Sequence, residues 1–240
     1  MKNLLILNFL ALNLNLWADL AVTPPLLQYR NDDKYNEITI KNTSERDRLF
    51  DISIKKWTQK DGKDIYEDTD DLIVMPITTK VIANNEKMVR VILKKPIAEA
   101  TQNSYRLFIR EAPSGKKKVT NGTSFEFLFS IIVPVFTHGK NFAANDNLVF
   151  TAQQDINNNK VLVTITNLGN TVALLSGVSA KSVSNTSYDQ ARYILHGTSY
   201  SWEFPLKVKK TIAQFTLDYL LNEKKLSKSL SIISDKLSKK

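Results

Sequence analysis

Hydrophobic and polar residues alternate along most of the chain at the two-residue period of a β-strand. Clusters of Asn, Asp, Gly, Ser and Pro separate these runs at intervals of about ten residues. The clearest alternating runs are residues 37–41, 50–57, 88–93, 105–110, 160–167, 202–206 and 211–216. Short strands at this spacing predict an all-β protein built from β-sandwiches, and no sustained helical periodicity appears before residue 220.

One run, residues 125–136, is apolar on both faces rather than on one. Its odd positions are all large and apolar, and its even positions include Leu128, Ile132 and Phe136. Pro134 lies within the run, and a proline is confined to edge strands or bulges because it has no N–H to donate. An exposed apolar edge strand is an aggregation hazard unless something covers it. The run therefore indicates an edge strand that another protein completes, or else an internal strand covered within its own domain.

A polar, turn-rich stretch at 137–147 indicates an interdomain linker. We expect a first β-sandwich domain over residues 19–138 and a smaller β domain over residues 145–222. The remaining tail, 223–240, has a different pattern, because its apolar residues Leu226, Leu230, Ile233 and Leu237 are spaced by four, three and four. This spacing predicts an amphipathic helix with a basic polar face, either a frayed extension or a segment that binds a membrane surface or a partner.

The first 18 residues resemble a secretory signal peptide. Lys2 precedes an apolar run from Leu4 to Trp17, which is short for a membrane span, and the small residue Ala18 follows it. A buried N-terminal helix is the alternative interpretation. We therefore expect an exported protein, and no later segment is long and apolar enough to be an integral membrane segment.

Composition narrows the partners and the chemistry. The net charge of +9 suits an acidic partner or a membrane surface, and without a basic motif interleaved with aromatic residues we expect no nucleic acid partner. The sequence has no cysteine, and its two histidines, His138 and His196, lie in separate predicted domains. The acidic stretch 67–71 lacks the residue order of a calcium loop, and no glycine-rich phosphate loop is present. We expect a binding protein that is not an enzyme and uses no cofactor or metal.

Four stretches resemble the periplasmic pilus-assembly chaperones of the chaperone–usher pathway, the PapD-like family. These stretches are 73–91, with a proline, a polar turn and Val89-Arg90; 105–113, which ends in Arg110-Glu111-Ala112-Pro113; the apolar run 125–136; and 193–205. The resemblance covers about residues 20–221, and the stretch 105–113 with the following apolar run is its most specific part. It implies two immunoglobulin-like sandwiches arranged in an L.

The resemblance also implies a mechanism and partners. Such a chaperone caps fimbrial or pilus subunits in the periplasm by donating a strand to each incomplete sandwich, and then delivers them to an outer-membrane usher. On this mapping the donor residues are Phe125, Phe127, Phe129, Ile131 and Val133, whereas Leu128 and Ile132 face the chaperone's own core. The rival interpretations are a structural fimbrial subunit or adhesin, and a carbohydrate-binding or hydrolytic β-sandwich.

The chain departs from the better-known branch of the family at the positions that bind the subunit's C-terminal carboxylate. That branch uses an arginine and a lysine, and the matching positions here are Leu26 or Leu27 and Pro134. Arg106 and Arg110 lie on one face of the neighbouring strand, and a guanidinium binds a carboxylate in a bidentate way. We expect Arg106 to be the carboxylate anchor, with Arg110 as the second choice. In this respect the chain resembles the archaic or spore-coat-associated branch of the family. The basic loop 114–124 could steer an acidic partner.

Overall fold

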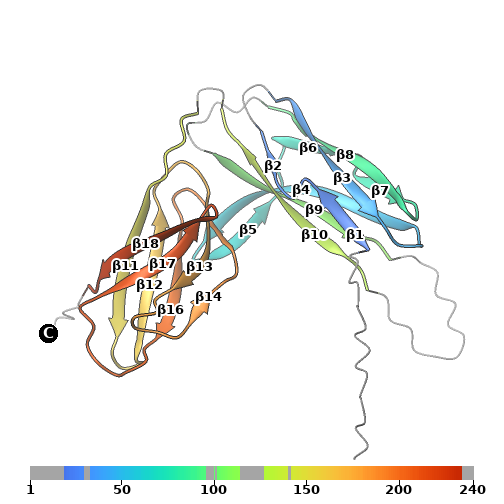
Figure 1. Cartoon of the computed structure of the whole chain (residues 1–240). Helices are drawn as coiled ribbons and strands as arrows, with labels where there is room; N and C mark the ends of the chain where they lie inside the picture. Colours follow the sequence, from blue (N-terminus) through green and yellow to red (C-terminus); the bar gives the residue numbers. More distant parts are fainter. Residues whose placement is uncertain are drawn as a thin grey trace, which may run out of the picture.

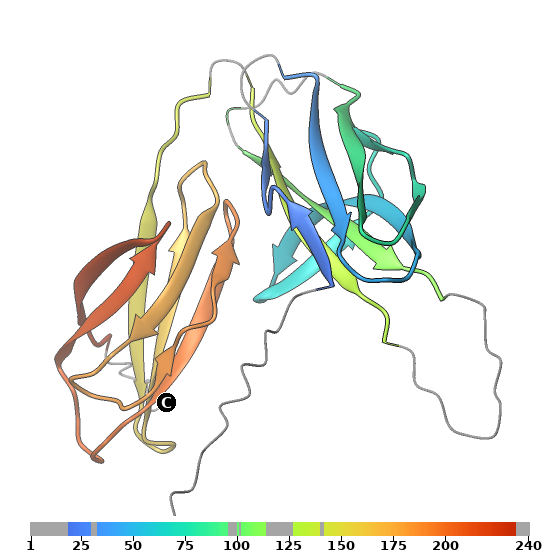
Figure 2. The ribbon, with the colours of Figure 1, turned by 45° about the vertical axis from the view of Figure 1, so that its right-hand side comes forward.

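A computed structural model describes residues 19–29, 33–95, 100, 102–113, 127–139 and 142–233. The described residues form eighteen β-strands and no helix, which confirms the predicted all-β class with two immunoglobulin-like sandwiches. The two sandwiches are inclined to each other and meet near one end, as two views show (Figures 1 and 2). The predicted signal peptide, residues 1–18, lies outside the described residues.

The first sandwich packs a four-stranded sheet, in the order β1-β3-β8-β6, against a larger sheet in the order β2-β10-β9-β4-β5, with β7 paired to β4. All neighbours are antiparallel except β10 and β2, which run parallel. The strands are β1 (Leu20–Thr23), β2 (Leu27–Gln28), β3 (Tyr35–Asn42), β4 (Arg48–Lys60), β5 (Lys63–Glu67), β6 (Leu72–Met75), β7 (Thr78–Val81), β8 (Asn85–Leu93), β9 (Asn103–Glu111) and β10 (Ser130–Thr137).

The second sandwich packs the sheet β11-β12-β16 against the sheet β14-β13-β17-β18, with β15 paired to β13. Its alternation of buried and half-buried residues is clearest in β12, where every second side chain faces the core. The strands are β11 (Leu148–Asp155), β12 (Lys160–Asn167), β13 (Ala173–Ser179), β14 (Ser187–Tyr188), β15 (Arg192–Ile194), β16 (Ser199–Pro205), β17 (Gln214–Leu221) and β18 (Lys224–Ser231).

The helix predicted over residues 223–240 is wrong for the part of the tail that is described. Lys224–Ser231 forms β18, which pairs with β17 along its whole length, and Leu230 is buried in the core of the second sandwich. The second domain therefore extends past residue 222 to Ile233, while residues 234–240 lie outside the described residues. A run of Lys and Ser between apolar residues is compatible with an exposed edge strand, where lysines discourage pairing with other chains.

Each sandwich contains a buried asparagine at the end of a long strand, Asn42 of β3 and Asn167 of β12, and the two make matching contacts. The Asn42 amide donates to the carbonyls of Arg46 and Val81 at 2.8 and 3.2 Å, and its oxygen accepts the N–H of Ser44 at 3.1 Å. Asn167 likewise donates to the carbonyls four residues later and across the sandwich, and accepts the N–H two residues later. One side chain thus satisfies several main-chain groups of a loop.

We expect Asn42→Ala to lower the free energy of unfolding of the first domain by roughly 1–3 kcal/mol, because it leaves buried main-chain groups without partners. Scanning calorimetry of the two unfolding transitions measures this loss. Asn36→Ala is the control, since Asn36 makes one long contact of 3.4 Å to the Gln28 carbonyl, and an equal loss from both changes would contradict the prediction.

Candidate functional site: an open strand edge and an interdomain arginine

The first feature of the site is the open edge of β10. On one side β10 pairs with β9 over its whole length, from Ser130 to Thr137. On its other side β2 covers only Val135 and Phe136. Among the described residues, nothing pairs with the outer side of β10 from Ser130 to Pro134. The sequence-based expectation of an edge strand therefore holds for this half of β10.

The main-chain groups of β10 alternate between β9 and this open edge. Phe129, just before β10, accepts a hydrogen bond from the Glu111 N–H of β9 at 2.8 Å, and the Phe136 carbonyl accepts one from Tyr29 on the opposite side at 2.9 Å. Because hydrogen-bonding direction alternates along an antiparallel pair, the even residues Ser130 and Ile132 direct their N–H and C=O groups to the open edge. Pro134 is in the same row, where its missing N–H removes no bond to β9.

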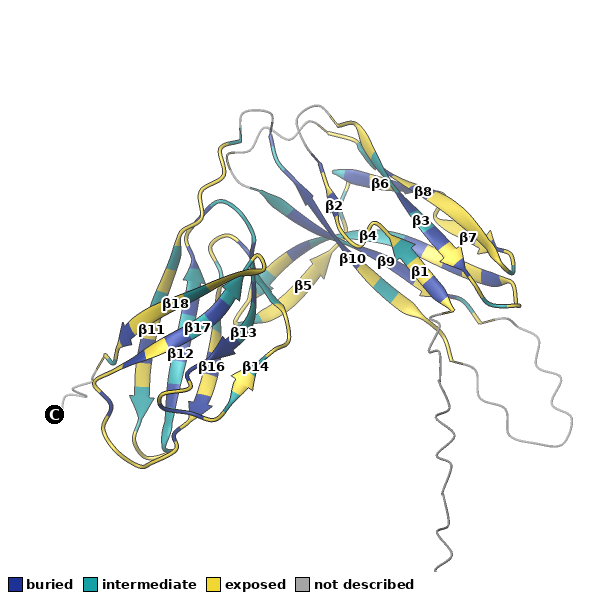
Figure 3. Cartoon of the chain, viewed as in Figure 1, coloured by how far each residue is buried: buried dark blue, intermediate teal, exposed yellow. Residues whose placement is uncertain are grey.

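The odd-numbered side chains of this segment run from solvent into the protein's own core. Phe127 is 83% exposed and Phe129 is 39% exposed, while Ile131 packs against the core of the first sandwich and Val133 is buried within it. Figure 3 shows β10 passing from exposed residues at its start to buried residues farther along. Val133, the last of the predicted donor residues, already fills the core of its own domain, so its side chain is not available to a partner.

The expectation for the even-numbered side chains is wrong. Leu128 and Ile132 are each 45% exposed, so neither is part of the first sandwich's core. The reason is the pleat: Val133 and Val135 face the core, so Ile132 and Phe136 face the other way, and Phe136 packs at the domain junction. Phe125 and the basic loop 114–124 lie outside the described residues.

The second feature is Arg106, which lies at the junction of the two domains. Its guanidinium carbon lies 3.7 Å from the centre of the Trp57 ring of β4 and 5.1 Å from that of Tyr193 of β15, in the second domain. Its Nε is buried and has no hydrogen-bond partner among the described residues. A stacked guanidinium with an unused donor is suited to bind an anion.

The charge of Arg106 is only partly offset by its surroundings. Burial lowers the pKa of the Arg106 guanidinium, while Tyr66, Asp64 and Tyr193 favour its charged form. No described carboxylate lies within ion-pairing distance of Arg106, and Asp64 is held by Gln59 and Tyr66. The neighbouring Lys55, opposite Arg106 in register, pairs with Asp68. The site therefore has a net positive charge.

Arg110 lies on the same face of β9 but away from the second domain. It is exposed, and its guanidinium carbon lies 4.7 Å from the centre of the Phe108 ring. Four residues of strand separate the two arginines by about 13 Å. Of the two predicted anchors, the structure brings only Arg106 to the domain junction. Sequence reasoning missed Trp57 and Tyr193, because the pair that surrounds Arg106 comes from two domains and has no local pattern.

Gln59, near the end of β4, fixes the junction beside Arg106. Its amide nitrogen donates to the Tyr193 carbonyl at 3.0 Å, and its oxygen accepts the Leu195 N–H at 3.0 Å and the Thr198 hydroxyl at 2.9 Å. Trp57, Phe136 and Leu195 form an apolar cluster across the same junction. The two domains are thus held by both apolar and hydrogen-bonded contacts.

We expect Gln59→Ala to loosen the domain junction by roughly 1–3 kcal/mol, since three hydrogen bonds between the domains are lost. Small-angle X-ray scattering should then show a broader range of interdomain distances. Gln153→Ala, in the second domain, is the control. A scattering curve identical to that of the unchanged protein would contradict a structural role for Gln59 in the junction.

The described residues show neither a metal centre nor a membrane-spanning helix. No group of three or more His, Cys, Asp or Glu gathers in the ranges that the structure describes. In those same ranges, no helix has the length and apolar character needed to cross a membrane.

Comparisons with solved structures show what this fold is similar to. The chaperone–tip subunit pre-assembly complex CsuC–CsuE, from archaic chaperone–usher Csu pili of Acinetobacter baumannii, matches with a TM-score of 0.67 and 19% identity, over 90% of this chain and 100% of the other. The SafB chaperone structure with SafA pilin of Salmonella enterica matches with a TM-score of 0.60 and 11% identity, over 90% and 96%. The YadV chaperone matches with a TM-score of 0.61 and 10% identity, over 90% and 100%.

At these identities the structural matches show the fold alone, and no curated protein sequence matches significantly. The family assignment comes from a family model, that of the pili and flagellar-assembly chaperones, PapD N-terminal domain, which matches residues 19–142. That match covers β1 to β10, including the open edge and Arg106, and so more than half of the chain. The chain therefore belongs to the PapD-like family of pilus-assembly chaperones.

Proposed function

We propose that this protein caps fimbrial or pilus subunits by adding the open edge of β10 to their incomplete sandwiches. The observation that carries the proposal is the row of outward main-chain groups at Ser130 and Ile132 beside exposed apolar side chains. Strand addition uses main-chain hydrogen bonds for affinity and alternate side chains for specificity. The open edge of β10 supplies the main-chain hydrogen bonds, and the side chains from Phe127 to Ile131 supply the specificity.

In this proposal, the side chains on one face of β10 and of the residues before it are shared between the chaperone's own core and the partner's groove. Val133 and Val135 fill the chaperone's own core, Ile131 lies at its boundary, and Phe127 and Phe129 extend beyond it. In the complex the two phenylalanines enter the partner's groove. Burying two such side chains stabilises the complex by roughly 3–6 kcal/mol before the costs of association and ordering. Leu128 and Ile132 then face the junction between the partner and the chaperone's second domain.

Arg106 binds a carboxylate of the subunit, its C-terminal group in the mapping from the family. Its guanidinium rests on Trp57 and has no described carboxylate partner, so a bidentate ion pair is available on its free side. The anchor and the donor segment lie on adjacent strands, because Arg106 is opposite Pro134 in register. A subunit bound to both is thereby fixed in register along β10.

The remaining parts of the proposal concern location and delivery. The apolar start of the chain resembles a signal peptide, so the protein acts in the periplasm, and the bound subunit passes to an outer-membrane usher. Stabilisation comes from the shared sheet, and the capping step therefore needs no nucleotide, metal or other cofactor.

Co-purification tests the proposal. The chain, affinity-tagged at its C-terminus, is expressed in the periplasm together with the fimbrial subunits encoded beside it. We expect a one-to-one complex that survives size-exclusion chromatography. If every such subunit folds and the chaperone is recovered alone, the proposed function is wrong.

A further inference from the structure

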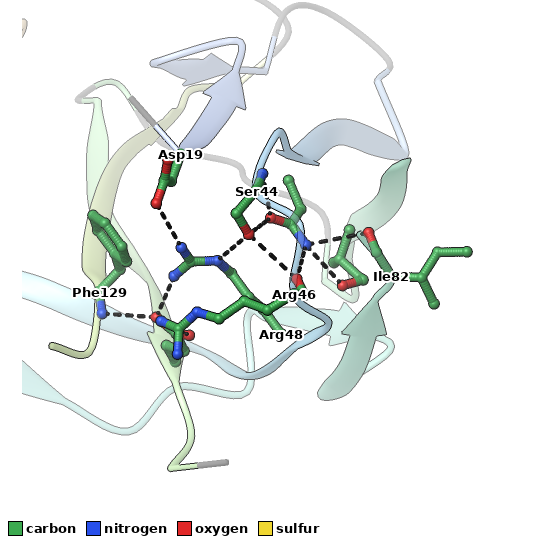
Figure 4. Close-up of polar contacts among 9 residues, drawn as sticks. Asp19, Ser44, Arg46, Arg48, Ile82 and Phe129 are labelled. Atoms are coloured by element: carbon green, nitrogen blue, oxygen red, sulfur yellow. Dashed lines mark hydrogen bonds and ion pairs between the residues drawn. The ribbon is translucent and has the colours of Figure 1, made fainter. Parts of the chain in front are cut away.

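The interior of the first sandwich ends in a buried ion pair rather than in apolar side chains. Arg48 of β4 and Glu111 of β9 occupy core-facing positions in line with Phe50 and Ile109. Their side chains are 1% and 3% exposed, and Arg48 Nη1 lies 2.9 Å from Glu111 Oε2. Asp19 and Arg46 extend the cluster, at 3.2 Å from Arg48 and Glu111 respectively (Figure 4).

This ion pair contacts Phe129, the residue of the proposed donor segment that directly precedes β10. The same Glu111 oxygen accepts the main-chain N–H of Phe129 at 3.1 Å, and the Glu111 N–H donates to the Phe129 carbonyl at 2.8 Å. Arg48 lies over the Phe129 ring, with 4.8 Å from its guanidinium carbon to the ring centre. Figure 4 shows the hydrogen bond from the Phe129 main chain and the position of Phe129 beside Arg48. Phe129 is thus fixed through both its main chain and its ring.

Burial of such a pair is hard to explain by stability alone. Removing two charges from water is costly, and replacing a buried ion pair by apolar residues of similar size is often neutral or stabilising. A charged acceptor does, however, hold a main-chain N–H more firmly than a neutral one. Because Phe129 precedes β10, its amide would otherwise be at the frayed end of the strand.

We propose that Glu111 is a positioning residue which, together with Arg48, holds Phe129 extended and ready for a partner. This inference rests on the proposed function for its purpose, but its structural content concerns the protein alone. Fixing the segment before binding reduces the ordering cost that the complex would otherwise meet. The partner class is a protein with an incomplete sheet whose groove accepts aromatic side chains at the position of Phe129.

Amide hydrogen exchange of the isolated protein, measured by NMR, tests the positioning. In Glu111→Gln, exchange at the Phe129 amide should accelerate about 10- to 100-fold, because its charged acceptor is lost. The double variant Arg48→Met with Glu111→Leu removes the pair without leaving a buried unpaired charge, and should fold and show the same acceleration. Glu37→Gln, which breaks the exposed ion pair with Arg90, is the matched control and should leave Phe129 unchanged.

Unchanged exchange at Phe129 in the folded double variant would overturn the inference, even if Glu111→Gln failed to fold. In the double variant, faster exchange at the Phe129 amide should be accompanied by slower association with the co-expressed subunit. Its melting temperature should be unchanged. Faster exchange with normal association would also overturn it, because positioning would then have no consequence for binding. Failure of the unchanged protein to capture any subunit counts against the proposed function alone, since the exchange experiment involves no partner.

Discussion

Phe127→Asp is expected to abolish capture of the subunit while leaving the chaperone folded. Phe127 is 83% exposed, so the free protein loses no packing when it is replaced. In the complex, the change removes a buried aromatic side chain and places a carboxylate in an apolar groove. Together these effects weaken binding at least about 100-fold. Co-purification and size-exclusion chromatography measure the loss, and the melting temperature checks the fold.

Ile77→Asp is the matched control for this change. Ile77 is 70% exposed in the connection between β6 and β7, away from the open edge of β10, and the same charge is introduced there. Capture should be unchanged in this variant. If Phe127→Asp folded and captured subunits as well as Ile77→Asp did, Phe127 would not enter the partner.

Arg106→Ala is expected to weaken capture at least about 30-fold, because it leaves a carboxylate of the partner desolvated without its cation. Arg106→Lys should recover part of the affinity, since it restores the charge but not the bidentate geometry or the stacking on Trp57. Titration of the purified complex partners measures the three affinities. The loss should diminish at high salt less than that of an exposed ion pair, because the site is half-buried.

Arg110→Ala separates the two candidate anchors. Arg110 is exposed and lies over Phe108, remote from the second domain, so its removal should change affinity by less than about threefold. A large loss in Arg110→Ala together with none in Arg106→Ala would assign the anchor to Arg110. Equal, small effects from both would mean that the subunit's carboxylate is bound elsewhere.

Alternation of apolar residues was sufficient to predict strands in both sandwiches. The runs 105–110 and 160–167 lie within β9 and β12, and Pro134 correctly indicated an edge for the half of β10 that β2 leaves open. The face assignment failed at Leu128 and Ile132, because both faces of the run are apolar and its period cannot say which face is inward. Only the pairing with β9 and the packing against the first core decide this.

The tail and the domain junction were beyond sequence reasoning for different reasons. Leu226 and Leu230 fit both a helical and a strand period, and pairing with β17 decides in favour of the strand. Arg106 was found from its position on β9, but its contacts with Trp57 and Tyr193 depend on how two domains meet. The Arg48–Glu111 pair was missed because charged residues at core-facing positions look like ordinary surface positions in the sequence.

Amide exchange in the complex tests most directly whether β10 pairs through its open edge with a strand of the partner. In the free chaperone, the outward amides of Ser130 and Ile132 should exchange fast, whereas those of Ile131 and Val133, directed to β9, are already protected. In the complex, Ser130 and Ile132 should become protected while Ile131 and Val133 change little. A stable complex in which Ser130 and Ile132 still exchange as fast as in the free protein would contradict strand addition at this edge.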